Sequence, residues 1–271
     1  MDVFDIIIIG GGAAATAAAL TAKNRGKSVA AVANAAETTA LWKAELITNY
    51  PGVPDIPGRE LARVMRAQLE SAARVISGRA LNIIPMGDTF GAAVENDFYT
   101  AKAVIIAAGI TRERLYPGES EFLGRGVSYC ATCDGMLYRG KRVALIGSGD
   151  EAKRDGDFLE GIGCEVIRLE KDARYEISGA DRADTVSFPG GSVRADGVFI
   201  IKDTVSVRSL VPGIEYENGG IVTDGAMKTS VPGVFAAGDC RGKPFQLAKA
   251  AGDGNIAALS ACEYIDNMSK K

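Results

Sequence analysis

Three consecutive glycines near the start of the chain constrain its fold more than any other feature. The apolar run 4–9 before them predicts a buried strand, and the alanine-rich run 13–23 after them predicts a helix. The run 28–33 predicts a second strand, which completes a strand–helix–strand unit with parallel pairing. Glycine lets the backbone approach a ligand closely, and a helix N-terminus offers unpaired N–H groups and a positive dipole to a pyrophosphate.

This glycine turn predicts dinucleotide binding, because Gly10-x-Gly12-x-x-Ala15 stands between a predicted strand and a predicted helix. The alternative is a glycine-rich turn in an ordinary α/β protein. At the end of the second strand an amide replaces the usual acid, and an amide can still form a hydrogen bond with ribose. The candidate cofactor-binding residues of this segment are Gly10, Gly12, Ala13, Ala14, Ala15 and Asn34.

A similar pattern occurs a second time along the chain. The predicted strand 143–146, the turn Gly147-Ser148-Gly149, the predicted helix 151–161 and the predicted strand 165–169 form another such unit. This weak duplication predicts an α/β protein with two Rossmann-like, three-layer dinucleotide-type domains. A later apolar strand, 234–237, delivers Gly238 and Asp239 to its carboxyl end, where open α/β sheets bind ligands.

The composition narrows the class of function. The chain has 271 residues, with 31 Lys and Arg against 34 Asp and Glu, and no histidine. The acidic balance argues against nucleic-acid binding, and the lack of imidazole excludes Ser-His-Asp hydrolases and His-built metal sites. The apolar run 6–20 follows Asp2 and Asp5 and is interrupted by glycines, unlike a signal peptide or a membrane span. We therefore expect a soluble protein of the cytoplasm.

A closely spaced pair of cysteines, Cys130 and Cys133, stands out among the five in the chain. Thiols at this spacing, opening a predicted helix, can close a small disulfide and reopen it, and Asp134 is placed to move protons. One alternative is half of a metal site, although the chain has no second such pair and no histidine; the other is cysteines that simply pack in the core. The candidate catalytic residues are therefore Cys130, Cys133 and Asp134, and no metal is expected. The remaining cysteines are predicted to be small apolar residues.

Taken together, these segments resemble the low-molecular-weight thioredoxin reductases among the FAD-dependent pyridine-nucleotide-disulfide oxidoreductases. The likeness rests on segments that follow the family's order along nearly the whole chain: Tyr50-Pro51-Gly52, Gly124-Arg125-Gly126-Val127-Ser128, Cys130-Ala131-Thr132-Cys133-Asp134-Gly135 and Ala236-Ala237-Gly238-Asp239.

The resemblance implies a discontinuous FAD-binding domain over 1–115 and 225–271, interrupted by an abbreviated central redox domain over 116–224. It also implies a homodimer in which electrons pass from FAD to the cysteine pair and on to thioredoxin or a thioredoxin-like protein. Cys133 would face the flavin, Cys130 would attack the partner's disulfide, and Asp134 would be the acid and base. Beyond the glycine turn, the implied FAD contacts are Asn49, Ala108, Gly109, Gly238, Asp239, Gln246, Leu247 and Ala248.

The chain departs from this family at the second glycine turn. Asp150 and Glu151 lie where a pyrophosphate would approach, and Glu170 follows the next strand, where NADPH-dependent members carry arginines. Glu170 would repel a 2′-phosphate, yet it could accept a hydrogen bond from the ribose of NADH. We therefore expect ferredoxin as the electron donor rather than NADPH, as in the flavin thioredoxin reductases that lack pyridine-nucleotide motifs. NADH and a deazaflavin are the alternative donors.

A ferredoxin is a small acidic carrier, so we expect a basic docking patch on this protein. The candidate side chains, each of which could equally belong to a solvated face, are Arg112, Arg114, Arg125, Arg139, Lys141 and Arg142. A second alternative for the whole chain is a non-catalytic, redox-sensing flavoprotein, because a degraded nucleotide site would leave an enzyme without its reductant.

Overall fold

The chain folds into two compact units. The first comprises residues 1–111 and 205–271, and the second comprises residues 112–204. The first unit is therefore discontinuous in sequence, as predicted. The computed structural model describes residues 3–109, 116–128, 131–171, 173–201 and 207–268.

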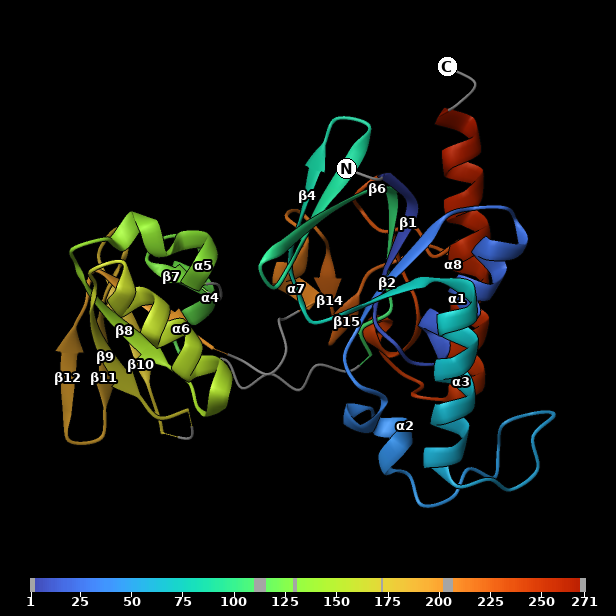
Figure 1. The fold of residues 1–271 in the computed structure, drawn as a ribbon, viewed down its shortest axis with the longest axis horizontal. Coiled ribbons are helices and arrows are strands. Elements are labelled where there is room, and N and C mark those ends of the chain that lie inside the picture. The colour runs from blue at the N-terminus through green and yellow to red at the C-terminus, as the bar shows by residue number, and fades with distance from the viewer. Residues whose placement is uncertain (1–2, 110–115, 129–130, 172, 202–206, 269–271) are drawn as a thin grey trace. The chain divides into compact units, whose positions relative to one another are not determined.

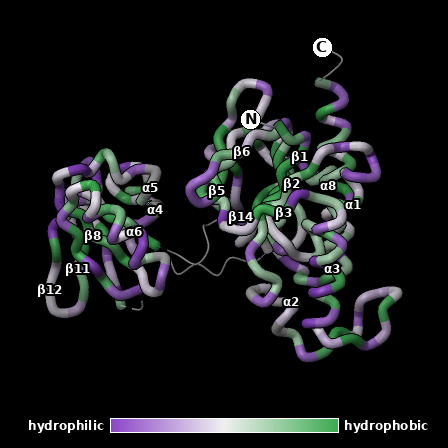
Figure 2. The backbone as a smooth tube through the Cα atoms, viewed as in Figure 1, coloured by the Kyte–Doolittle hydropathy of each residue, from purple (hydrophilic) through white to green (hydrophobic). Residues whose placement is uncertain are grey.

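A parallel sheet lies at the centre of the first unit, in the order β3-β2-β1-β6, with β16 paired to the end of β6. The first half of β6 also pairs with the antiparallel strand β5, which pairs with β4 in turn. Figure 2 shows β1 and β2 as largely apolar, which is typical of parallel strands buried on both faces. The strands are β1 (Val3–Ile9), β2 (Val29–Ala33), β3 (Arg74–Ser77), β4 (Ala80–Met86), β5 (Thr89–Val94), β6 (Asp97–Ile106) and β16 (Val234–Ala236).

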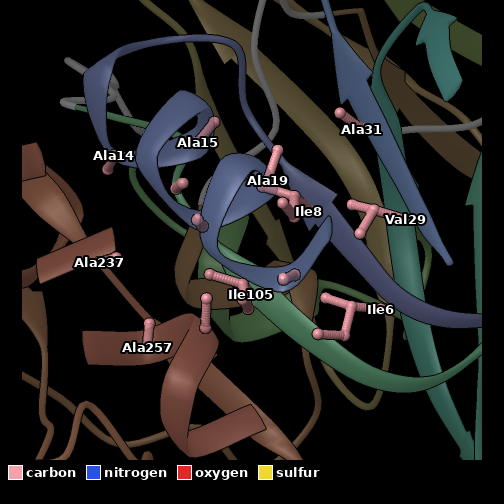
Figure 3. Packing of buried hydrophobic residues seen from close by; sticks show 14 of the residues in the cluster. Ile6, Ile8, Ala14, Ala15, Ala19, Val29, Ala31, Ile105, Ala237 and Ala257 are labelled. Carbon is pink, nitrogen blue, oxygen red and sulfur yellow. The ribbon is translucent and has the colours of Figure 1, made fainter. Parts of the chain in front are cut away.

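Helices cover one face of this sheet and the β4–β5 hairpin covers the other (Figure 1). The alanines of α1 let it approach both β1 and α8 closely, as Figure 3 shows for Ala14, Ala15 and Ala19. The main helices are α1 (Ala13–Asn24), α3 (Gly58–Ala72) and α8 (Leu247–Met268). The smaller elements are η1 (Ala36–Thr38), α2 (Ala40–Lys43), α7 (Val207–Leu210), β14 (Tyr216–Glu217), β15 (Gly220–Ile221) and η3 (Gly238–Arg241).

The second unit repeats this layering on a smaller scale. Its parallel sheet has the order β7-β13-β8-β9; α6 packs on one face, and an antiparallel sheet of β10, β11 and β12 packs on the other. The strands are β7 (Val127–Ser128), β8 (Arg142–Ile146), β9 (Glu165–Leu169), β10 (Glu176–Gly179), β11 (Ala183–Phe188), β12 (Gly191–Arg194) and β13 (Gly197–Ile200). The helices are α4 (Glu119–Phe122), α5 (Ala131–Asp134), η2 (Gly135–Tyr138) and α6 (Gly149–Gly161). The predicted α/β architecture with two Rossmann-type units is confirmed.

The segment 205–224, which the sequence places in the central domain, packs with the first unit instead. Val207, Leu210 and Ile221 are buried there, in the same apolar cluster as Val104 and Ile106 of β6. The strands of this segment are short, so they give little periodic signal from which a domain boundary could be predicted. None of the helices in the described part of the chain combines the length and apolar character that a membrane-spanning segment needs.

Candidate functional site

The carboxyl ends of β1, β2, β6 and β16 meet along one side of the first sheet, which we call the carboxyl edge. Register aligns the last residues of these strands: Ile9 pairs with Val32 and Ile106, and Ile106 pairs with Ala236. The residues that follow the strands therefore lie next to one another. They are the glycine turn 10–12, Asn34, the segment Ala107, Ala108 and Gly109, and the segment Gly238 and Asp239. Open α/β sheets bind their ligands at this edge.

The glycine turn combines close packing with open space. Gly10 has a φ of 135°, and a Cβ there would lie 2.1 Å from the carbonyl oxygen of Ala107, so only glycine fits. A Cβ at Gly12 would meet nothing within 4 Å. Gly12 caps α1 without a side-chain hydrogen bond, and no acid lies in the first turn of that helix. The helix N-terminus is thus open to an anionic group. The buried alanines of this first turn are Ala13, Ala14 and Ala15.

Asp239 offers a hydrogen-bond acceptor at the same edge. Its Oδ1 atom is buried, and among the residues that the structure describes no donor reaches it. Burial raises the pKa of Asp239; the charge of Lys249 opposes the rise and that of Asp253 adds to it. Buried acceptors are nearly always satisfied, so an orphaned one next to an open helix N-terminus fits a ligand that brings a hydroxyl donor. FAD carries both the pyrophosphate and the hydroxyl groups that these residues would bind.

Asn49 and Gln246, both predicted to contact FAD, meet in the structure. The Nδ2 atom of Asn49 donates to Oε1 of Gln246 at 2.9 Å, across 197 residues of sequence. Both side chains are exposed, and Leu247 and Ala248 follow at the start of α8. The loop after α2 and the start of the last helix therefore belong to one surface of the first unit.

Residues that the sequence interpretation missed surround the turn at Gly238. Asp253 is 7% exposed, and its Oδ2 atom accepts from the Gly238 N–H at 3.1 Å, from Arg241 at 2.9 Å and from Lys249 at 3.0 Å. The only signal in the sequence was the spacing of Lys249 and Asp253, which places both on one helix face. Such a spacing is common on solvated helices, so it could not identify a buried cluster.

The catalytic candidates belong to the second unit. Cys130 and the side chain of Cys133 lie outside the described residues, whereas the backbone of Cys133 belongs to α5. The hydroxyl of Ser128 donates to Oδ2 of Asp134 at 2.6 Å, and Ser128 is buried at the end of β7. The helix that the sequence predicts after the pair is the single turn of α5, continued by η2.

The other cysteines are buried and free, as predicted. Cys164 donates to the carbonyl oxygen of Tyr138 at 3.1 Å. Burial raises the pKa of Cys240 to about 11, and its thiol lies 3.3 Å from the carbonyl oxygens of Ile106 and Ala237. Cys262 lies on α8 and is buried in the apolar cluster that this helix shares with α1 and β1. High pKa and burial make these thiols poor nucleophiles.

At the second glycine turn, the serine of the turn binds an acidic side chain that follows the next strand. Ser148, the residue before α6, does not cap the helix; its hydroxyl donates to Oε2 of Glu170 at 3.2 Å and accepts from the N–H of Lys171 at 3.4 Å. Asp150 lies exposed in the first turn of α6. Asp150 thus adds a negative charge at the N-terminus of α6, and Glu170 adds one beside Ser148; both charges disfavour a phosphate at this turn.

Two Rossmann-type units, an open glycine turn in one and a Cys-x-x-Cys segment in the other, define the class of dinucleotide-dependent disulfide oxidoreductases. The family model described as pyridine nucleotide-disulphide oxidoreductase matches residues 4–186 and 175–254. The chain belongs to this family.

The chain is similar over its full length to thioredoxin reductases. It is 33% identical over 301 residues to a thioredoxin reductase of Treponema pallidum (strain Nichols), which covers 98% of each chain. Among solved structures, a ferredoxin-flavin thioredoxin reductase from Clostridium acetobutylicum has a TM-score of 0.82 and 36% identity, covering 100% of both chains. The atypical thioredoxin reductase TRi from Desulfovibrio vulgaris Hildenborough has a TM-score of 0.74 and 28% identity, covering 97% of this chain and 98% of that one. The protein is thus an enzyme, a flavoprotein disulfide oxidoreductase of the thioredoxin reductase type, as the sequence predicts.

Proposed function

We propose that the protein binds FAD at the carboxyl edge and reduces the disulfide of thioredoxin or a thioredoxin-like protein through Cys130 and Cys133. The observation that carries the proposal is the meeting of the open N-terminus of α1 with the orphaned oxygen of Asp239 at that edge. The names of the relatives support thioredoxin as the substrate. When bound, FAD supplies the electron pair that opens the Cys130–Cys133 disulfide.

The thiols and Asp134 then complete the exchange. The Cys130 thiolate attacks one sulfur of the substrate disulfide, which forms a mixed disulfide and releases the other sulfur as a thiolate. Asp134 protonates this leaving thiolate. Cys133 next attacks Cys130, so that the second substrate thiol leaves and the Cys130–Cys133 disulfide forms again. The 2.6 Å hydrogen bond from Ser128 fixes the carboxyl group of Asp134 for this proton transfer.

We propose ferredoxin rather than NADPH as the electron donor. The contact between Ser148 and Glu170 and the exposed Asp150 support this choice, because carboxylates beside a glycine turn repel the phosphates of a nicotinamide dinucleotide. The structural relative from Clostridium acetobutylicum, named a ferredoxin-flavin thioredoxin reductase, supports it as well. NADH, which lacks the 2′-phosphate, and a deazaflavin remain the alternative donors.

Exposed cations of the second unit support docking of an acidic carrier. Arg125 and Arg182 line a surface hollow of about 400 Å³ together with Leu137, which is 70% exposed. Arg139 and Lys141 are exposed nearby in sequence, and Arg142 pairs with Glu165 at 2.7 Å. The candidates Arg112 and Arg114 lie outside the described residues.

Anaerobic reduction of the flavin by each donor tests the proposal. The bound flavin should lose its visible absorbance rapidly with reduced ferredoxin and slowly with NADPH, NADH or a reduced deazaflavin. Rapid reduction by NADPH would refute the donor assignment. A protein that binds no flavin would refute the function itself.

A redox-sensing flavoprotein is the second candidate, and the carboxylate of Glu170 at the glycine turn of the second unit favours it, because it disfavours a dinucleotide reductant. Oxidised thioredoxin mixed with the protein and reduced ferredoxin separates the two functions. Repeated turnover shows an enzyme, whereas flavin reduction without thioredoxin reduction shows a sensor.

We further propose that the enzyme is a cytoplasmic homodimer. Ile256 and Leu259 are exposed on α8 and support an apolar contact between copies. The free cysteines Cys164, Cys240 and Cys262 support a reducing compartment. Sedimentation of the flavin-loaded protein checks the dimer; a monomer at micromolar concentration would contradict it.

A further inference from the structure

The turn at Gly238 is held by an ion cluster that the proposed reaction does not use directly. Oδ2 of Asp253 accepts from the backbone N–H of Gly238, while Nζ of Lys249 donates to the carbonyl oxygen of the same residue at 2.9 Å. Lys249 also reaches the carbonyl oxygen of Gly242 at 3.3 Å. Both backbone polar groups of Gly238 are thus fixed by charged side chains of α8.

Arg241 connects this cluster to the preceding segment of the chain. Its NH1 atom lies 2.9 Å from Oδ2 of Asp253, and its Nε atom donates to the hydroxyl of Thr223 at 2.6 Å. The side chains of Arg241, Lys249 and Asp253 are 19%, 22% and 10% exposed. Removing charges from water is costly, and apolar packing of equal volume is often at least as stable. An ion cluster that is largely removed from water at this position therefore points to a role in fixing geometry.

The residue that the cluster orients is Asp239. Gly238 has a φ of 80°, and a Cβ there would lie 3.0 Å from the Cβ of Ala14, so the turn also presses against α1. The carboxylate of Asp239 follows directly, with its Oδ1 atom buried and unpaired among the described residues. A turn that is fixed on both sides holds that acceptor in one place before any ligand arrives.

We propose that Asp253, Lys249 and Arg241 are positioning residues for the flavin, because they hold the Gly238–Asp239 turn so that the free oxygen of Asp239 can accept a hydrogen bond from a hydroxyl of FAD. The inference rests on the proposed function, since it requires FAD at the carboxyl edge.

The test measures the affinity of the flavin-free full-length protein for FAD by quenching of flavin fluorescence. Lys249→Met keeps the aliphatic stem and removes the ammonium group, and Asp253→Asn keeps the shape and removes the charge. The matched control is Lys102→Met, which breaks the 2.8 Å pair between the middle of β6 and Asp5 in the first half of β1, away from the residues that follow these strands. Melting temperatures of the flavin-free proteins are recorded in parallel, to separate fold stability from binding.

Each cluster variant should weaken FAD binding by about tenfold or more, which corresponds to about 1.4 kcal/mol, and the control should match the wild type. The double variant, Lys249→Met with Asp253→Asn, should bind FAD more tightly than Asp253→Asn alone. It leaves only Arg241 without a negative partner, whereas Asp253→Asn leaves Arg241 and Lys249. If Lys249→Met binds FAD with wild-type affinity, whatever its melting temperature, the inference is overturned. This outcome is decisive even if Asp253→Asn does not fold. Failure of the wild type itself to bind FAD would instead refute the proposed function.

Discussion

The two units contain the same strand–glycine turn–helix element, but the charged groups around the two glycine turns differ. At the first turn, Gly12 faces open space and the first turn of α1 carries no acid. At the second, the hydroxyl of Ser148 is bound to Glu170, and Asp150 lies in the first turn of α6. The glycines and the fold are alike, so the difference lies in the charge around each turn. A glycine motif therefore fixes the backbone path but does not by itself specify a ligand.

The largest expected effect is the loss of thioredoxin reduction when one cysteine of the pair in the second unit is replaced. Cys133→Ser should abolish thioredoxin reduction, while the flavin of the first unit is still reduced by ferredoxin. The control is Cys164→Ser in the same unit, where the new hydroxyl can donate to Tyr138 as the thiol does. Coupled thioredoxin assays with a parallel flavin spectrum check this. Thioredoxin turnover at the wild-type rate in Cys133→Ser would contradict the proposal that the first unit binds the flavin and the second carries out the disulfide exchange.

Alanine at the first glycine of each turn tests how rigid the two turns are. Gly10→Ala should destabilise the flavin-free protein by about 3 kcal/mol, because strain at positive φ adds to a clash with backbone. A Cβ at Gly147 would instead lie 2.9 Å from the Cβ atoms of Ala152 and Ile201, a milder overlap than the 2.1 Å at Gly10, and Gly147 has no positive φ. Gly147→Ala should therefore cost less, about 2 kcal/mol. Urea unfolding measures both; equal losses would contradict the difference.

Ionisation of Cys240, near the carboxyl edge of the first unit, should lower the free energy of unfolding at alkaline pH. Its pKa of about 11 lies above the ordinary thiol value of 9.0, so the buried neutral thiol contributes fully to the stability of the fold below pH 9, and this contribution is lost as the pH rises towards 11. The stability difference between the wild type and Cys240→Ala should narrow by about 1 kcal/mol from pH 8 to pH 10. Urea unfolding at the two pH values measures it. A constant difference would show that the thiol is hydrated.

The smallest expected effect is on the rate of flavin reduction by NADPH, when the acidic side chain at the second glycine turn is replaced. Glu170→Arg removes the carboxylate bound by Ser148 and supplies a cation for a 2′-phosphate, so NADPH should reduce the flavin about fivefold faster. Glu176→Arg, the same charge change at an exposed position of β10, is the control. Stopped-flow flavin absorbance measures the rates. Equal rates in the two variants would mean that charge at this turn does not set the choice of donor.

Local signals in the sequence predicted most of the fold. Apolar runs of strand length, alanine-rich helices and the glycines between them gave both layered units, because each of these signals lies within one element. The carboxyl edge was predictable for the same reason: its residues directly follow buried strands. The boundary near 204 was not, because the short strands after it show their partner only through tertiary packing of residues such as Val207 and Ile221.

The candidate site was less predictable where it depends on contacts between distant segments. The cluster of Asp253 joins η3 to α8, and no local pattern distinguishes its charges from solvated ones. Glu170 was noticed for its charge, but its bond to Ser148 requires the ends of β8 and β9 to lie side by side. Asn49 and Gln246 were placed near the flavin by resemblance, whereas their direct contact follows from the fold alone.

The discontinuity of the first unit sets the order of events during synthesis. Residues 1–111 leave the ribosome before the second unit, yet β16, Asp239 and α8, which complete the carboxyl edge, emerge after it. The second unit is fully translated in between, and its continuous chain can fold at once. The flavin site is therefore complete only after α8 has emerged, so a ribosome stalled between the end of the second unit and α8 would display a domain capable of thiol chemistry but no complete flavin site.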